Sequence, residues 1–263
     1  MANNLLFLII SFGASVVGAI CGIGGGVIIK PVLDFFRVAD VATISFLSGC
    51  TVLSMSCYSV VKNLSTGESR VNMKTGTPLA LGGAVGGILG KQLFSSVKAA
   101  FASPNTVGAV QAACLAALTV GTLIYTINKN RIRTKQVSNL IVCLIIGLAL
   151  GILSSFLGIG GGPFNLVILF FFFSMDTKTA AQNSLYIILF SQVTSLLTTL
   201  LTHSVPDFQW IALILMISGG ILGGIVGRKA NKKMDEKAVD KLFIILMCII
   251  ILISIYNTYR YLH

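Results

Sequence analysis

The chain has 263 residues, of which 55% are hydrophobic and 10% are charged, and its mean hydropathy is +0.93. A soluble domain carries roughly 25% charged residues, so the composition excludes a water-soluble globular protein and predicts one whose surface faces the lipid bilayer. The net charge of +11 does not indicate nucleic-acid binding, because the basic residues lie in loops between apolar runs. This distribution is typical of loops on the cytoplasmic side of a membrane.

Eight apolar runs predict an all-α polytopic membrane protein. They cover residues 4–36, 41–61, 75–95, 106–128, 138–173, 179–202, 208–227 and 241–259. The first and the fifth run are too long for one span, since about 35 helical residues extend over roughly 50 Å, against a hydrocarbon core of about 30 Å. We expect each of these two runs to contain a spanning helix, a break and a shorter helix.

The two long runs contain the same glycine motif. Residues 22–26 read Gly-Ile-Gly-Gly-Gly, and the motif recurs at residues 158–162, 136 positions later. Consecutive glycines are poor helix formers, each about 1 kcal/mol worse than alanine. A second match, at an offset of 137, relates the glycine-rich segments 82–91 and 219–228, each ending in a basic residue. The sequence therefore predicts a duplicated unit, interrupted at the same point in each copy.

The distribution of Lys and Arg predicts that the chain reverses at the second break. Eight simple spans would place 11 basic residues on one side and 8 on the other, whereas a reversal gives 14 and 5, which the positive-inside rule favours. The internal repeat extends the reversal to the first break. We therefore predict two inverted repeats of about five helical segments each, four spans plus a glycine-broken long first helix. Their expected bounds are 1–128 and 139–263, joined by a basic cytoplasmic linker at 129–138.

Inverted repeats with broken helices are typical of transporters, and their breaks commonly bind the substrate. An open helix N-terminus presents unpaired N–H groups and the positive end of the helix dipole, and glycine lets a ligand approach the backbone. We predict an anion site near the bilayer midplane, formed by the backbone at Gly24, Gly25, Gly26, Gly160, Gly161 and Gly162. For segments 82–91 and 219–228, close helix packing is the favoured interpretation.

Polar side chains follow each break inside apolar runs. Amides there are costly unless they are paired or face a wet cavity. The candidate binding side chains are Ser45, Asn165, Gln182, Asn183 and Ser184, and Ser45 matches Ser184 at an offset of 139. The serines are the weaker candidates, because a hydroxyl can bond to a carbonyl of its own helix.

The charged residues are not expected to form the site. Lys30 follows the first break, but Leu166 is its counterpart, so we expect the lysine to extend to the outer interface. The acidic residues fall in or beside predicted loops, which gives no support for coupling through a buried acid. We expect no matched pair of basic residues in the membrane interior, so neutral donors should hold the anion. No cofactor, metal site or catalytic group is indicated.

Together these motifs resemble those of the TauE/SafE sulfite exporter family of the TSUP superfamily. The matching features are the two Gly-Ile-Gly-Gly-Gly motifs, Pro31 after the first, Ser45, Asn183–Ser184, and the glycine-rich segments ending in Lys91 and Arg228. The resemblance covers essentially the whole chain. It implies a multi-pass protein of the bacterial plasma membrane that is not an enzyme and that moves sulfite or small organosulfur anions such as sulfoacetate or thiosulfate. A homo-oligomer is compatible with it.

Two alternatives from other functional classes stay open. One is a passive anion channel. The other is a membrane-embedded protein that handles sulfur through a thiol, with Cys21 beside the first break as the nucleophile. A thiol without a nearby base is a poor nucleophile. A flux assay separates the alternatives, because channels show no counterflow exchange and enzymes transform the substrate.

Overall fold

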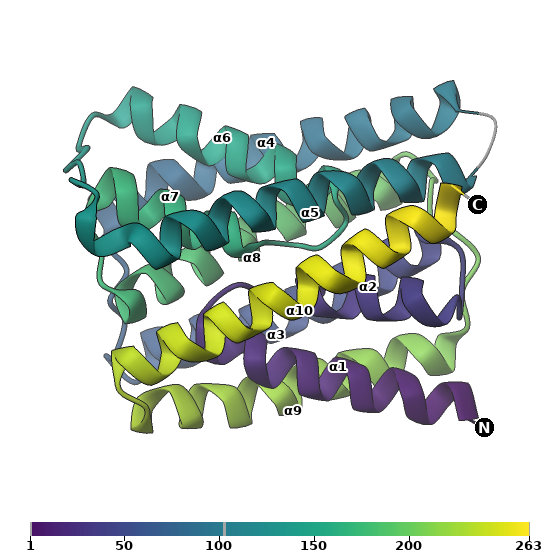
Figure 1. Cartoon of the computed structure of the whole chain (residues 1–263), viewed down its shortest axis with the longest axis horizontal. Helices are drawn as coiled ribbons and strands as arrows, with labels where there is room; N and C mark the ends of the chain where they lie inside the picture. The colour runs from purple at the N-terminus through teal and green to yellow at the C-terminus, as the bar shows by residue number, and fades with distance from the viewer. Residues whose placement is uncertain (1, 102–103, 263) are drawn as a thin grey trace.

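The computed structural model describes residues 2–101 and 104–262, and this part of the chain is all helical (Figure 1). The first half contains α1 (Ala2–Cys21), α2 (Gly26–Phe36), α3 (Val41–Ser65), α4 (Met73–Ala100) and α5 (Pro104–Asn128). After the short 3-10 helix η1 (Lys129–Arg131), the second half contains α6 (Leu140–Phe156), α7 (Pro163–Phe173), α8 (Thr177–Leu201), α9 (Trp210–Lys233) and α10 (Glu236–Leu262). The predicted five segments per half are confirmed.

The helices have the dimensions and surface of a membrane protein. Six described helices, α1, α3, α5, α8, α9 and α10, are long and apolar enough to cross a membrane. The 28 residues of α4 extend over about 42 Å, which also exceeds a bilayer core. Large apolar side chains such as Leu201 and Leu252 are exposed. The prediction of a polytopic membrane protein is confirmed.

Both glycine breaks reverse the chain. In Figure 1, α1 starts at the end that holds both termini and stops in the middle of the bundle, and α2 returns to that end; α6 and α7 do the same from the opposite end. The turns use a backbone that only glycine adopts readily. Gly22 and Gly24 both have φ +75°, and their equivalents Gly158 and Gly160 have φ +65° and +70°. The two repeats are therefore inverted, as predicted.

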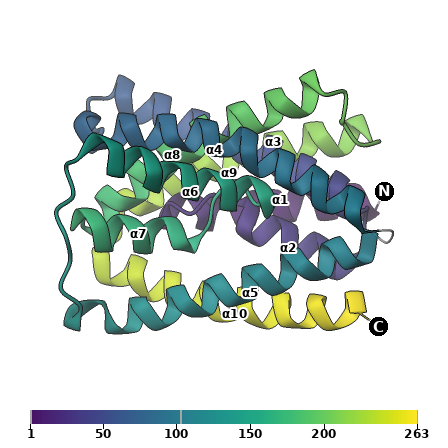
Figure 2. The same cartoon turned by 90° about the horizontal axis from the view of Figure 1, so that it is seen from above.

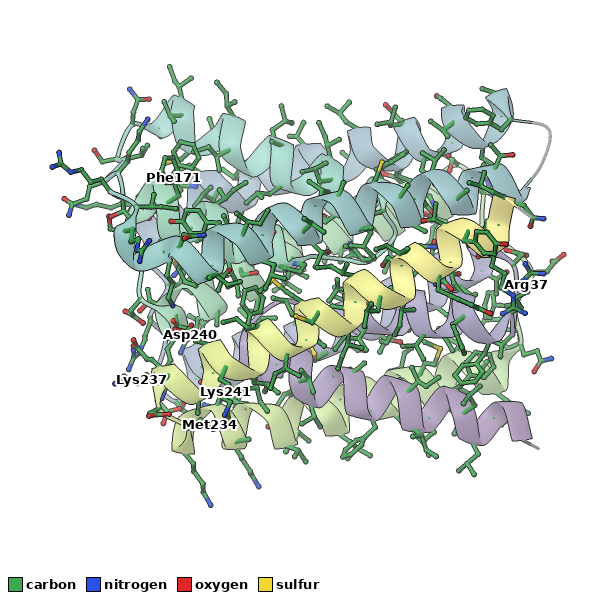
Figure 3. All side chains as sticks on the ribbon, viewed as in Figure 1. Arg37, Phe171, Met234, Lys237, Asp240 and Lys241 are labelled. Carbon is green, nitrogen blue, oxygen red and sulfur yellow. The ribbon has the colours of Figure 1, made fainter. Side chains whose placement is uncertain are left out.

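The basic loops gather at one end of the bundle, called the basic end below. It comprises the loops 66–72, 129–139, 174–176 and 234–235. Arg70 forms an ion pair with Asp176 there, at 3.7 Å, which joins the α3–α4 loop to the start of α8. Figure 3 shows Lys237 and Lys241 at this end and Arg37 at the other. This distribution is the predicted one, with 14 Lys and Arg residues on one side and 5 on the other. The positive-inside rule predicts that the basic end faces the cytoplasm.

Glycine-mediated packing joins the two halves. The fourth helix of each half packs against the first helix of the other, α4 on α6 and α9 on α1, while α5 and α10 pair along one side of the bundle (Figure 2). A Cβ at Gly82 would lie 2.2 Å from the Leu144 carbonyl oxygen, and a Cβ at Gly223 would lie 2.5 Å from that of Phe12. The packing interpretation of segments 82–91 and 219–228 is confirmed.

The helices that follow the two hairpins begin with the same cap. The carboxylate of Asp40 accepts a hydrogen bond from the Thr43 N–H at 2.7 Å, and the carboxylate of Asp176 accepts one from the Thr179 N–H at 2.8 Å. Both helices have 25 residues, so α3 and α8 correspond at an offset of 136 throughout.

This correspondence corrects the predicted offset of 139. Ser45 is equivalent to Ala181, and Ser184 is equivalent to Ser48. The contacts agree, because Gly22 packs against Ala181 while its equivalent in the second break packs against Ser45. The error has a simple origin: three residues are close to one helical turn of 3.6, so the polar residues share a helix face in either alignment.

Candidate anion-binding site

The two breaks meet in the middle of the bundle. α2 begins at Gly26 and α7 at Pro163, and neither helix has a side-chain cap at its N-terminus. A Cβ at Gly26 would lie 1.9 Å from the Ile159 carbonyl oxygen, and one at Gly161 would lie 3.1 Å from the Ile23 carbonyl oxygen. Ile23 and Ile159 are equivalent in the repeat, so each break contacts the same carbonyl of the other, although the contacting glycines differ by one position.

The backbone donors at the breaks are unpaired. Within the described residues, no hydrogen bond is donated by the N–H groups of Gly24, Gly25, Gly26, Gly160, Gly161 and Gly162. All six residues are buried. Buried N–H groups without partners are rare in proteins, and here they gather at two positive helix ends. This arrangement supplies the donors that a small anion needs.

Three of the five candidate side chains lie at the breaks. Asn165, in the first turn of α7, donates through Nδ2 to the Ser184 hydroxyl at 3.4 Å, and its Oδ1 is buried without a partner. Ser45 donates to the Val41 carbonyl at 2.7 Å, which is the intrahelical bond that made serines weak candidates. Its side chain lies directly against Gly158.

The other two candidates lie toward the basic end. Gln182 accepts a hydrogen bond from the Arg70 N–H at 2.8 Å. Asn183 donates to the carbonyls of Thr179 at 2.9 Å and Arg70 at 3.3 Å. Both amides therefore attach α8 to the 66–72 loop, although Asn183 Oδ1 is buried without a partner. The hydrogen bonds offset part of the cost of placing an amide in a membrane segment.

Three polar residues beside the breaks were not among the predicted candidates. The hydroxyls of Ser15 and Ser48 are buried without a partner and lie next to Gly25 and Gly26, respectively. Gln192 is 3% exposed, and the carbon of its amide would lie 3.1 Å from a Cβ on Gly160. The correct alignment of α3 with α8 would have identified Ser48, because it is the equivalent of Ser184.

Two equivalent cavities flank the breaks. The cavity at the basic end, called the vestibule below, has a volume of about 240 Å³, and its lining includes Ala19, Ser59, Asn63, Ala181, Arg228 and Asn231. The second cavity, called the distal cavity, has about 20 Å³, and the repeat equivalents of those six residues line it: Ser155, Ser195, Thr199, Ser45, Lys91 and Phe94. The breaks thus lie between two cavities of related origin and very different volume.

Comparison with known protein families identifies the family of this chain. The model described as Sulfite exporter TauE/SafE matches residues 7–254. The chain belongs to this family. No curated protein and no solved structure matches it significantly. The match confirms the resemblance carried by the glycine motifs, and it identifies the chain as a multi-pass membrane transporter of the sulfite and anion exporter class.

In this TauE/SafE protein, two predictions about charge are wrong. Lys30 is 3% exposed and forms an ion pair with Asp34 at 3.3 Å, within α2. Lys30 does not reach an interface because α2 lies inside the bundle, where Asn257 of α10 donates to the Pro31 carbonyl at 2.8 Å. Asp34 does lie beside a loop, near the end of α2, as predicted, but its side chain is buried, so the protein contains a buried acid that the sequence did not indicate.

The second correction concerns matched basic residues. Lys91 and Arg228 correspond in the repeat, and each lines one of the two cavities of the TauE/SafE protein. The sequence predicts both in loops, because they end the glycine-rich segments, but α4 and α9 continue past them. Cys21 is fully buried at the end of α1. Among the described residues, no group of three His, Cys, Asp or Glu could hold a metal ion.

Proposed function

We propose that this protein exports sulfite or a related small sulfur oxyanion across the bacterial plasma membrane by alternating access. The observation that carries the proposal is the set of six buried, unpaired backbone N–H groups at two reciprocal helix breaks. Helix N-termini bind oxyanions through such groups. A site made of backbone donors also binds an anion without a buried cationic side chain, and the desolvation of such a side chain would be costly. Family membership supports an anion of this class.

The unequal cavities support alternating access over a passive channel. The vestibule opens toward the basic end, whereas its equivalent on the other side of the breaks is nearly closed. Because the repeats are inverted, an exchange of their conformations would close the vestibule and open the distal cavity. Close packing of Gly22 on Ala181 and of Gly26 on Ile159 separates the two cavities, which argues against an open channel.

We assign the following roles to the candidate residues. The backbone at Gly24–Gly26 and Gly160–Gly162 holds the anion, assisted by Asn165, Ser184 and Ser45. Gln182 lines the vestibule, and Gln182 and the buried Asn183 both hold the 66–72 loop. A thiol mechanism is not favoured, because Cys21 is enclosed in the core.

Transport by the purified protein in lipid vesicles tests the proposal. Sulfite, thiosulfate, sulfoacetate and sulfate would be supplied separately, with and without the same unlabelled anion inside. We expect saturable uptake of at least one sulfur oxyanion, accelerated by internal unlabelled anion. Uptake without such acceleration would indicate a channel, and a chemically altered product would indicate an enzyme. If none of the four anions moves, the proposed function is wrong.

A further inference from the structure

The vestibule contains an arginine that already binds a carboxylate. The Arg228 side chain is 12% exposed and donates to Asn63 Oδ1 at 2.6 Å, to Thr66 Oγ1 at 3.1 Å and to Glu68 Oε2 at 2.5 Å. Lys232 donates to Glu68 Oε1 at 2.7 Å. A guanidinium and an ammonium thus converge on one pair of carboxylate oxygens, in the geometry that also suits a sulfonate or sulfite.

The carboxylate that fills this position belongs to a loop. Glu68 lies between α3 and α4, and its side chain is 44% exposed. Hydrogen bonds from Lys232 and Thr66 lower the pKa of Glu68, so the group is an anion at neutral pH. The pair of Glu68 with Lys232 is exposed on both sides, and exposed ion pairs are individually weak; in the pair with Arg228 only the glutamate is exposed. A soluble oxyanion can therefore compete with Glu68 for Arg228.

The equivalent lysine in the distal cavity has no carboxylate beside it. The Lys91 ammonium forms no hydrogen bond or ion pair with the described residues, and it lies 5.2 Å from the centre of the Phe94 ring. The nearby Ser155 hydroxyl is buried without a partner. A partly buried cation without a counter-charge is unfavourable. At about 20 Å³ the distal cavity has room for little more than a water molecule in this conformation. In the exchanged conformation, in which this cavity opens, both groups can donate hydrogen bonds to a small anion.

We infer that Arg228 and Lys91 form two equivalent anion subsites, one on each side of the breaks, and that Glu68 competes with the substrate for the first. The inference rests on the proposed function and extends it to the recognition of the anion before and after the breaks. An oxyanion that arrives from the basic end displaces Glu68, contacts Arg228 and then reaches the backbone donors. Lys91 holds the anion on the distal side.

Sided transport measurements test the two subsites. Half-saturation for sulfite would be measured from each side at low salt, in vesicles of both orientations. We expect Arg228→Gln to raise the half-saturation concentration for sulfite about tenfold to hundredfold when sulfite is supplied from the basic end only. Lys91→Gln should raise the half-saturation concentration only when sulfite is supplied from the distal side. Glu68→Gln should lower it from the basic end. Lys229→Gln and Lys98→Gln are matched controls, because both are exposed neighbours of the tested cations.

The outcomes separate this inference from the proposed function. If Arg228→Gln and Lys91→Gln behave like their controls, or act equally from both sides, the subsites are wrong even though sulfite is transported. A higher half-saturation for Glu68→Gln would show that Glu68 positions Arg228 rather than competing. Sulfite binding to the purified protein, measured by calorimetry, is a second readout. Binding that depends on Arg228, without transport by the wild type, would refute the proposed function and retain the vestibule subsite.

Discussion

A single methyl group at Gly26 should separate the two breaks. The Cβ introduced by Gly26→Ala would lie 1.9 Å from the Ile159 carbonyl oxygen, and real Cβ contacts begin near 3.0 Å, so the oxygen must move by about 1.1 Å. This oxygen belongs to the backbone of the other break and cannot rotate away as a side chain can. Overpacking of this kind costs about 1–3 kcal/mol of stability. Each donor that loses a charged acceptor removes a further ~1.5–3 kcal/mol of anion affinity.

The measurements are thermal unfolding in detergent, sulfite binding by calorimetry and sulfite flux in vesicles. We expect Gly26→Ala to weaken sulfite binding at least tenfold. Gly13→Ala and Gly121→Ala are the controls, because both glycines are helical and a Cβ there meets nothing within 4 Å. These controls should keep full binding and gain up to about 1 kcal/mol of helix stability. Wild-type sulfite affinity in a folded Gly26→Ala protein would refute a site built on the breaks.

Three further predictions follow from the interior and from the topology. Lys30→Met or Asp34→Asn alone should lower the free energy of unfolding by about 3–5 kcal/mol, and the double variant should recover most of it; thermal unfolding that shows additive losses would contradict a paired role. Asn183→Leu should loosen the α3–α4 loop, which would be measured as faster proteolysis of that loop, and should reduce sulfite affinity less than Gly26→Ala does. A hundredfold loss of sulfite affinity would instead show that Asn183 contacts the bound anion. Cysteines replacing Lys129 and Lys233 should both resist an impermeant thiol reagent in intact cells, and labelling of only one would disprove the topology.

The architecture was predictable because its signals are local and repeated. An apolar run that is too long for one span, interrupted by three glycines, has few structural solutions, and the same run occurs twice. The distribution of basic residues then selects the reversal, because a simple traverse leaves almost no charge asymmetry. The unpaired glycine amides follow from the break itself.

The contacts of individual side chains were less predictable, because they depend on distant helices. Nothing near Lys30 in the sequence shows that α10 encloses α2, and Asn183 binds a loop more than 100 residues away. The matched pair Lys91 and Arg228 was visible in the repeat, yet the ends of the glycine-rich segments resemble the ends of helices. The three-residue error between α3 and α8 arose because hydrophobic and polar periodicity cannot distinguish one helical turn from the next.

The fourth helix of each half packs on the first helix of the other half, and this arrangement affects insertion of the chain into the membrane during synthesis. The glycine face of α4 packs on α6, which the ribosome completes only after the whole first half, and α1 packs on α9, which emerges near the end of synthesis. The first helix to enter the membrane must therefore remain in lipid without its main neighbour until almost the entire chain has been inserted. A nascent chain that stops near residue 128 would present two unfilled helix grooves to the bilayer, where membrane quality control could recognise them.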